Sequence, residues 1–182
     1  MPSVIPVEIV SYDPRWTALF EEAKREIIAA IGPYVSRVEH VGSTSVAGLA
    51  AKPTIDVLIG VHHLAEAPSF LPPLEALGYE YVAKHEAVFP QRRYLRRIVD
   101  GRHTHHLHIV EPKSNFFKEH LLFRDYLRSH PEDAARYAAL KYELAEKYRG
   151  DRDAYTEGKS DFIQGILMKA LRAPGTRTSE EF

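Results

Sequence analysis

Apolar positions change their period several times along the chain, and each change predicts a different element. After Asp13-Pro14 they recur every three or four residues up to Ile31, which predicts a helix with Asp13 as its N-cap and Gly32-Pro33 as its end. Short runs rich in β-branched residues predict strands instead. We expect strands at 5–10, 37–41, 54–59, 79–82, 94–99 and 104–110, with Asp100-Gly101 as a hairpin turn between the last two.

Helical spacing returns at 64–77 and dominates the chain after Pro112. Further helices are predicted at 116–130, 131–148 and 154–171. The sequence contains no internal repeat and no low-complexity linker. We therefore expect one α+β domain over 1–172, with a core at 1–112 and a helical part at 113–172. The polar segment 173–182 is expected to be a disordered tail.

Composition limits the classes of function. The 24 basic and 25 acidic residues leave almost no net charge, which argues against nucleic acid as the main partner and requires any phosphate attraction to be local. The chain has no cysteine, so disulfides, thiolate catalysis and cysteine-ligated zinc are excluded. No stretch reaches the roughly 20 apolar residues that cross a bilayer, and the N-terminus does not resemble a signal peptide. We expect a cytoplasmic protein with no membrane partner.

A turn of small residues after the strand at 37–41 is the first candidate site. Gly42 can take a positive φ or let the backbone approach a ligand closely. The hydroxyl residues that follow could cap a short helix over 46–50, whose free N–H groups would suit a phosphate. These hydroxyl residues are Ser43, Thr44 and Ser45. Lys52 is close enough in sequence to add a positive charge.

Asp56 and a histidine pair are the second candidate. Asp56 lies inside an apolar strand, where an ionised carboxylate needs a metal, a cation or backbone donors. His106 and His108 are two positions apart on a predicted strand, so both imidazoles project from one face and can bind one metal. If the two strands are neighbours, Asp56 is the natural third ligand. Such a site suits Zn²⁺, Mn²⁺ or Fe²⁺ better than Mg²⁺, which prefers oxygen.

Simpler explanations compete with both candidates. The Gly-Ser turn can be no more than a helix cap, and Asp56, His106 and His108 can be strand residues that hydrogen-bond to their neighbours. Arg96, Arg124 and Lys159 are further candidates for phosphate or nucleotide contacts, although an exposed strand edge or surface ion pairs explain them more simply. His103 and His105 are expected to have no role.

Several separate segments together resemble the GrpB family (UPF0157) of the nucleotidyltransferase superfamily. They are EHVGSTSVAGLAAKPTIDVLIG, HHLHIV, LLFRDYLRSHPEDAARYAALK and YTEGKSDFI, and the resemblance spans roughly 7–171. It implies a mixed sheet flanked by helices, with a C-terminal helical extension and the Gly-Ser turn facing a triphosphate. It also implies an NTP as substrate or ligand, and a divalent metal (Mg²⁺ or Mn²⁺) held by carboxylates, for which Asp56 is the candidate. The histidine pair adds Zn²⁺ as a further option, and in a transferase we expect Lys52 to have a catalytic role, balancing the developing charge.

One position departs from the superfamily's metal motif, which has two acids separated by one apolar residue. The same-face neighbours of Asp56 are Thr54 and Leu58, so one carboxylate is missing whichever alignment is chosen. Phosphoryl transfer with two metal ions would then need compensation from elsewhere.

Three functions remain open at this point. The first is a metal-dependent nucleotidyltransferase with an unknown acceptor. The second is a non-catalytic accessory domain that binds a nucleotide or phosphorylated small molecule, as the resemblance implies from fusions to dephospho-CoA kinase. The third is a hydrolase with a His/Asp metal site on the same fold. No Gly-x-x-x-x-Gly-Lys-Ser/Thr loop is present, so kinase activity is not expected. The sequence leaves the oligomeric state open.

Overall fold

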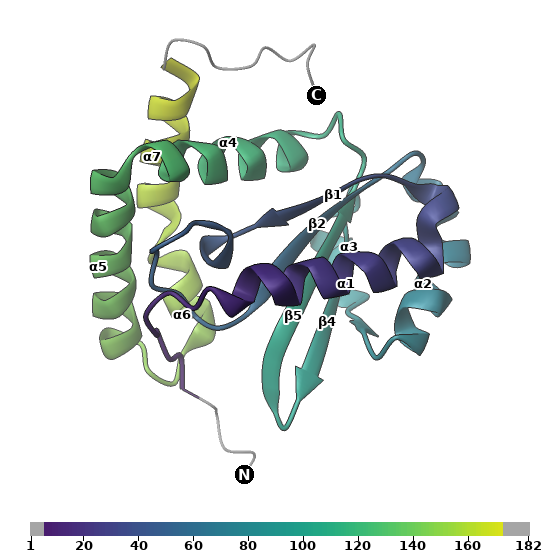
Figure 1. The fold of residues 1–182 in the computed structure, drawn as a ribbon, viewed down its shortest axis with the longest axis horizontal. Helices are drawn as coiled ribbons and strands as arrows, with labels where there is room; N and C mark the ends of the chain where they lie inside the picture. Colours follow the sequence, from purple (N-terminus) through teal and green to yellow (C-terminus); the bar gives the residue numbers. More distant parts are fainter. Residues whose placement is uncertain (1–5, 173–182) are drawn as a thin grey trace.

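A mixed sheet of five strands forms the centre of the protein, whose computed structural model describes residues 6–172 (Figure 1). The spatial order is β1-β2-β5-β4-β3. The strands are β1 (Val35–Val41), β2 (Ile55–Val61), β3 (Glu80–Tyr81), β4 (Arg93–Val99) and β5 (Arg102–Val110). Only the central pair, β2 and β5, is parallel, and the other neighbours run antiparallel. The predicted α+β class with a mixed sheet flanked by helices is confirmed.

Helices cover both faces of this sheet, and a helical group lies beyond one end of the strands (Figure 1). The first face carries α1 (Arg15–Ile31) and α2 (Ala67–Ala76), and α4 (Asn115–Ser129) packs on the second. The helical group contains α5 (Pro131–Lys147), α6 (Arg152–Glu157) and α7 (Ser160–Arg172). The remaining elements are α3 (Lys84–Val88) and the short 3₁₀ turns η1 (Gly32–Tyr34), η2 (Ser43–Ser45) and η3 (Leu64–Glu66).

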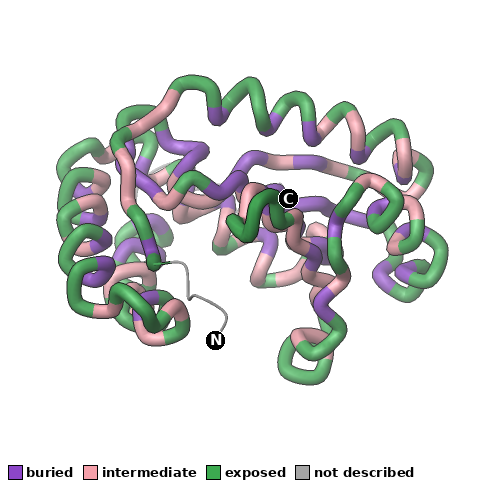
Figure 2. Tube along the Cα trace, turned by 90° about the horizontal axis from the view of Figure 1, so that it is seen from below, coloured by how far each residue is buried: buried purple, intermediate pink, exposed green. Residues whose placement is uncertain are grey.

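Each side of β2 faces a different apolar cluster, as its alternation predicts. Ile55, Val57 and Ile59 pack against the buried stripe of α1. Leu58 points the other way and packs with Phe117 of α4. Buried residues accordingly follow the strands through the middle of the molecule, while the outer sides of the helices are exposed (Figure 2). Asp56 shares the side of Leu58, which places its carboxylate beneath the helical part of the fold.

Several sequence predictions need correction. Residues 6–10 form no strand apart from a single bridge between Val10 and Ala51, because proline at position 6 cannot donate to a ladder. The helix expected over 154–171 is two helices, since the chain turns at Gly158, where a Cβ would come within 2.7 Å of Leu144. Helix α3 was not predicted. The tail at 173–182 lies outside the described residues. Within the described part, no helix is both long and apolar enough to cross a membrane.

Candidate metal and phosphate site

The register of the parallel pair brings Asp56 and the two histidines together. Asp56 is the register partner of His106, and Leu58 is the partner of His108. His106 Nδ1 lies 3.2 Å and His108 Nε2 lies 3.4 Å from Oδ1 of Asp56. A carboxylate accepts but cannot donate, so both imidazoles donate to it. One ligand atom from each of the three side chains lies within 4.8 Å of the others, which is the convergence that the sequence predicted.

The surroundings of Asp56 keep its carboxyl group ionised. Burial opposes ionisation, but the hydrogen bonds and positive charge of His106 and His108 hold the pKa of Asp56 well below its ordinary value. Burial lowers the pKa of His108, against the opposing effect of Asp56. The other ring nitrogen of His108, Nδ1, is buried with no hydrogen-bond partner among the described residues.

His103 joins this cluster, contrary to the expectation that it has no role. Its Nδ1 lies 2.9 Å from Nε2 of His106, the ring nitrogen that points away from Asp56. Burial and nearby positive groups lower the pKa of His103 to about 4, so the ring is neutral at pH 7. A neutral partner on the far nitrogen fixes the tautomer and ring orientation of His106, as outer-sphere groups do in metal sites.

The position of the Asp56 carboxylate leaves no room for a side chain at position 42, so this residue has to be glycine. Its φ of +72° lies in the region that side chains disfavour, as the sequence predicted. A Cβ at this position would lie 2.5 Å from Oδ2 of Asp56. The Gly-Ser turn and the carboxylate are therefore in direct contact, although they are separated by thirteen residues of the chain.

The hydroxyl residues of the turn have different surroundings. Ser43 and Thr44 line the cavity described below, together with Gly42. Thr44 Oγ1 also lies 2.9 Å from Nε2 of the buried His40. Ser45 faces inward instead and donates to the carbonyl of Gly42 at 2.6 Å. The predicted helix over 46–50 is wrong, because the helical turn is η2 and its hydroxyls bond within the turn and to the strand. The predicted helix N-terminus at position 46 is therefore replaced by the start of this shorter turn at Ser43.

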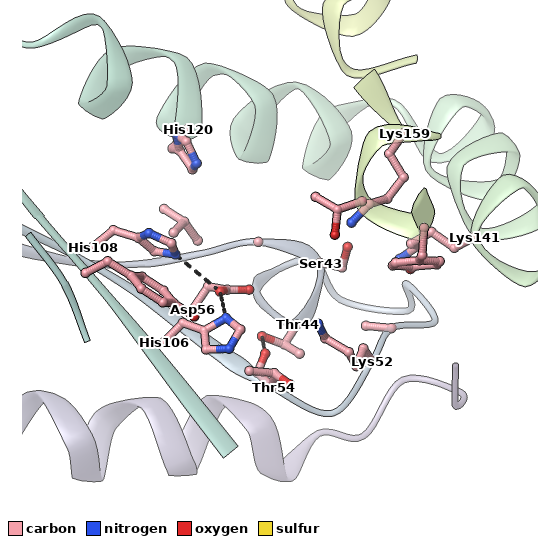
Figure 3. A pocket seen from close by; sticks show the side chains of 16 residues that line it. Ser43, Thr44, Lys52, Thr54, Asp56, His106, His108, His120, Lys141 and Lys159 are labelled. Atoms are coloured by element: carbon pink, nitrogen blue, oxygen red, sulfur yellow. Dashed lines mark hydrogen bonds and ion pairs between the residues drawn. The ribbon is translucent and has the colours of Figure 1, made fainter. Parts of the chain in front are cut away.

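A cavity of about 330 Å³ lies between the sheet and the helical part, and we call it the basic cavity (Figure 3). The volume is at the lower end of the range for small-molecule sites, roughly 300–1,000 Å³. Its lining includes Asp56, His106 and His108 on the sheet and three lysines on the opposite side. These lysines are Lys52 in the loop before β2, Lys141 on α5 and Lys159 between α6 and α7.

None of the three lysines forms an ion pair within residues 6–172. Burial lowers the pKa of Lys52 to about 8 and that of Lys141 to about 7, and it also lowers the pKa of Lys159. The Lys141 side chain is only 2% exposed, and its amine donates to the carbonyl of Ala50. An anion in the basic cavity would supply the missing negative charge.

His120 and Lys141 are among the lining residues that sequence reasoning missed. His120 points from α4 into the cavity (Figure 3), and its Nδ1 donates to the carbonyl of Phe116 at 2.8 Å, which leaves Nε2 as an acceptor. Burial lowers the pKa of His120 to about 4. Lys141 occupies an apolar position of its helix, between the buried residues Tyr137 and Leu144. The signal that could have identified Lys141 is a lysine at a position where the helical pattern predicts a core residue.

Arg96 and Arg124 are not brought to the cavity. Arg96 forms a two-pronged ion pair with Glu80 on the neighbouring strand, both contacts at 2.9 Å. Arg124 is buried against β1, where it donates to Glu39 at 2.8 Å and to the carbonyl of His40 at 3.1 Å. Both guanidinium groups are thus occupied by structural partners. Lys52 and Lys159 are the predicted basic residues that do line the cavity.

The donor set fits one transition-metal ion better than two magnesium ions. Two imidazoles and one carboxylate converge, and such mixed N/O sets suit Mn²⁺, Zn²⁺ or Fe²⁺. The two positions where a second acid could stand on the same face are Thr54 and Leu58, and both are buried. No other carboxylate joins the metal-ligand group in the described part of the chain.

Comparison with solved structures agrees with this fold. A crystal structure of the conserved protein GrpB from Enterococcus faecalis superposes with a TM-score of 0.82 at 37% identity, covering 91% of this chain and 98% of that one. The Cid1 poly(U) polymerase matches with a TM-score of 0.54 at 14% identity, covering 82% of this chain and 49% of that one. The second match shows that the fold is shared with a nucleotidyltransferase.

Comparison with curated sequences identifies the family. A UPF0157 protein of Bacillus subtilis is 38% identical over 166 residues, which cover 91% of this chain and 48% of that protein. A dephospho-CoA kinase of Mycolicibacterium paratuberculosis is 32% identical over an alignment covering 91% of this chain and 46% of that protein. The chain thus spans about half the length of these two relatives. The sequence profile described as GrpB protein matches residues 6–169, and the chain therefore belongs to the GrpB family.

Proposed function

We propose that this chain binds a nucleoside triphosphate, or a similar phosphorylated small molecule, together with one divalent cation. The observation that carries the proposal is the pairing of two opposite sites within one cavity: Asp56 with His106 and His108 on one side, and unpaired lysines on the other. The first suits a cation and the second suits phosphate oxygens. The nucleotidyltransferase-like fold supports a nucleotide as the ligand.

The residues would divide the task as follows. Asp56, His106 and His108 would hold the cation, which supplies neutralisation and orientation of the phosphates when it is bound. Lys52 and Lys159 would face phosphate oxygens and balance negative charge there. Ser43 would contribute a hydroxyl to the same phosphates. The acceptor of any transferred group is not part of the proposal.

This geometry favours ligand binding over group transfer by two metal ions. The buried Leu58 leaves one carboxylate in the cluster, and a symmetric clamp on attacking and leaving oxygens needs two ions. A single cation beside the lysines is sufficient to bind and orient a triphosphate. Release of pyrophosphate on mixing protein, NTP and Mn²⁺ would extend the proposal to a nucleotidyltransferase.

Isothermal titration of each common NTP, with and without Mn²⁺, tests the proposal. We expect binding that strengthens when Mn²⁺ is present and that His108→Ala removes. His63→Ala is the matched control, because His63 is exposed and lines neither this cavity nor its neighbour. The proposal is wrong if no NTP binds with either Mn²⁺ or Zn²⁺, or if His108→Ala and His63→Ala bind equally well.

A further inference from the structure

A second cavity of about 230 Å³ adjoins the basic cavity, and we call it the α4–α7 cavity. Five lining residues are common to both: Gly42, Ser43, Asp56, His120 and Lys159. Because these residues border both spaces, a ligand that reaches past Asp56 and Lys159 can occupy the two cavities at once. The candidate metal and phosphate site lies at the junction.

The α4–α7 cavity has a different chemistry from its neighbour. Its own side chains are mostly apolar, with Phe123 on α4, Tyr137 on α5, and Ile163 and Leu167 on α7. Among the residues that line this cavity and not the basic cavity, Glu119 and Gln164 are polar, and both are exposed. Lys159, at the junction, is its one lysine. A phosphate there would meet apolar walls and the Glu119 carboxylate, so this cavity favours an uncharged group.

The walls of this cavity are packed against one another and hold a fixed shape. Tyr137 stacks on Phe162 of α7 with ring centroids 5.1 Å apart. Phe123 meets the same Tyr137 edge-on at 5.4 Å. A nucleobase is flat and has apolar faces and a polar edge, which matches apolar walls with one amide at the rim. The Gln164 amide can both donate and accept at such an edge.

We propose that the α4–α7 cavity holds the nucleoside part of the ligand, while the basic cavity holds its phosphates. The proposal rests on the proposed function, since it assumes that phosphates bind beside Asp56 and Lys159. It adds the orientation of the ligand and the residues that recognise its organic part. It also makes α7 a recognition element rather than only a packing helix.

Separate titrations test this orientation. Inorganic tripolyphosphate and each of the four common NTPs are titrated in the presence of Mn²⁺, and their affinities are compared. The wild-type protein should bind at least one NTP about 10-fold or more tightly than tripolyphosphate, as expected for a base against aromatic walls. Gln164→Trp should fill the mouth of the cavity and reduce this ratio to about 1. Its affinity for tripolyphosphate should remain unchanged.

Met168→Trp is the matched control, because Met168 lies one turn further along α7 and is 53% exposed outside this cavity. It should keep the wild-type ratio. Glu119→Trp, which fills the mouth from α4, serves as a second variant if Gln164→Trp does not fold, as judged by circular dichroism.

The outcomes separate this inference from the function on which it rests. If tripolyphosphate binds as tightly as every NTP, the phosphate site stands and the nucleoside assignment is overturned. If both filled variants weaken tripolyphosphate and NTP equally, the cavity is an entrance rather than a nucleoside site, and the proposal is overturned. If neither probe binds, the proposed function fails together with the inference.

Discussion

The two sides of the basic cavity balance charge in opposite ways. On the sheet, Asp56 accepts hydrogen bonds from His106 and His108, so its negative charge has partners within the protein. On the side formed by the loop and the helices, Lys52, Lys141 and Lys159 have no carboxylate partner in the described chain. The carboxylate charge on one side is balanced within the protein, and the lysine charges on the other side have no such partner.

This difference underlies the proposed division of the cavity between a cation and an anion. A cation bound between the carboxylate and the imidazoles would replace these hydrogen bonds, once the ligating ring nitrogens have given up their protons. Buried amines without a counter-ion cost stability when they are charged, and a bound anion would offset that cost. Under the proposed function, the sheet side would hold the metal and the lysine side would face the phosphates. Substitutions on each side should affect the two ligands separately.

The largest effect is expected for Asp56→Asn. Loss of the carboxylate should weaken Mn²⁺ binding by more than the roughly 10–100-fold that losing an outer-sphere partner costs. Without metal, the same change should strengthen tripolyphosphate binding, because it removes a negative charge from the cavity. Titration calorimetry for each ligand measures both. Affinities that fall together would show that the two sides are not separate.

Lys159→Met should have the next largest effect, and it should be confined to the anion. A charge-assisted hydrogen bond contributes roughly 1.5–3 kcal/mol, so tripolyphosphate affinity should fall about 10–100-fold. Mn²⁺ affinity should stay within about 2-fold, because the lysine is not a ligand. Lys147→Met, at an exposed position of α5, is the control. An unchanged anion affinity would remove Lys159 from the site.

His103→Ala should weaken Mn²⁺ and Zn²⁺ binding by about 10-fold, since the outer hydrogen bond to His106 is lost. His103→Asn should recover part of the loss, because an amide can replace the ring nitrogen as a partner. Tripolyphosphate binding without metal should not change. A role in folding alone would instead lower the melting temperature of both variants and leave their metal affinities equal to the wild type.

The smallest effect is on stability. Lys141→Met should raise the free energy of unfolding by on the order of 1 kcal/mol while weakening anion binding, a trade-off common at functional sites. The gain should be largest below pH 7, where both the native and unfolded lysine are charged. It should shrink towards pH 10, because the lowered native pKa of about 7 leaves only the unfolded state protonated between these values. Urea unfolding at several pH values measures it, and a gain that grows with pH would contradict the assignment.

The sheet side of the site could be predicted from sequence because strand periodicity is local. Alternation alone places His106 and His108 on one face and Asp56 on the side of Leu58. The sequence predicted that Asp56 would join the histidines if their two strands were neighbours. The parallel pairing of β2 with β5 meets this condition. The strands and their order along the chain could also be predicted from the sequence, apart from the short extended segment at 6–10.

The lysine side depends on docking between distant segments, which no local pattern specifies. Lys141 reaches the cavity only because α5 packs beside the loop at 46–52, where its amine meets Ala50. His120 and Tyr137 depend on the same packing. Arg96 and Arg124 show the converse, since Glu80 on β3 and Glu39 on β1 are distant from them in sequence and take up their charge. Sequence reasoning identified basic residues but could not assign their partners.

The parallel pairing of β2 with β5 has a consequence for the order of folding. Asp56 and His106 are register partners that are 50 positions apart in sequence, and β1, β2 and the β4–β5 hairpin must meet before either is fixed. Contacts between such distant segments form slowly, because closure of the intervening loop costs entropy before the contacts stabilise the chain. The β4–β5 hairpin, whose strands meet over a short turn, should form earlier. A pulse-labelling hydrogen-exchange experiment should therefore find β4 amides protected before those of β2, with Asp56 and His106 brought together only at the later step.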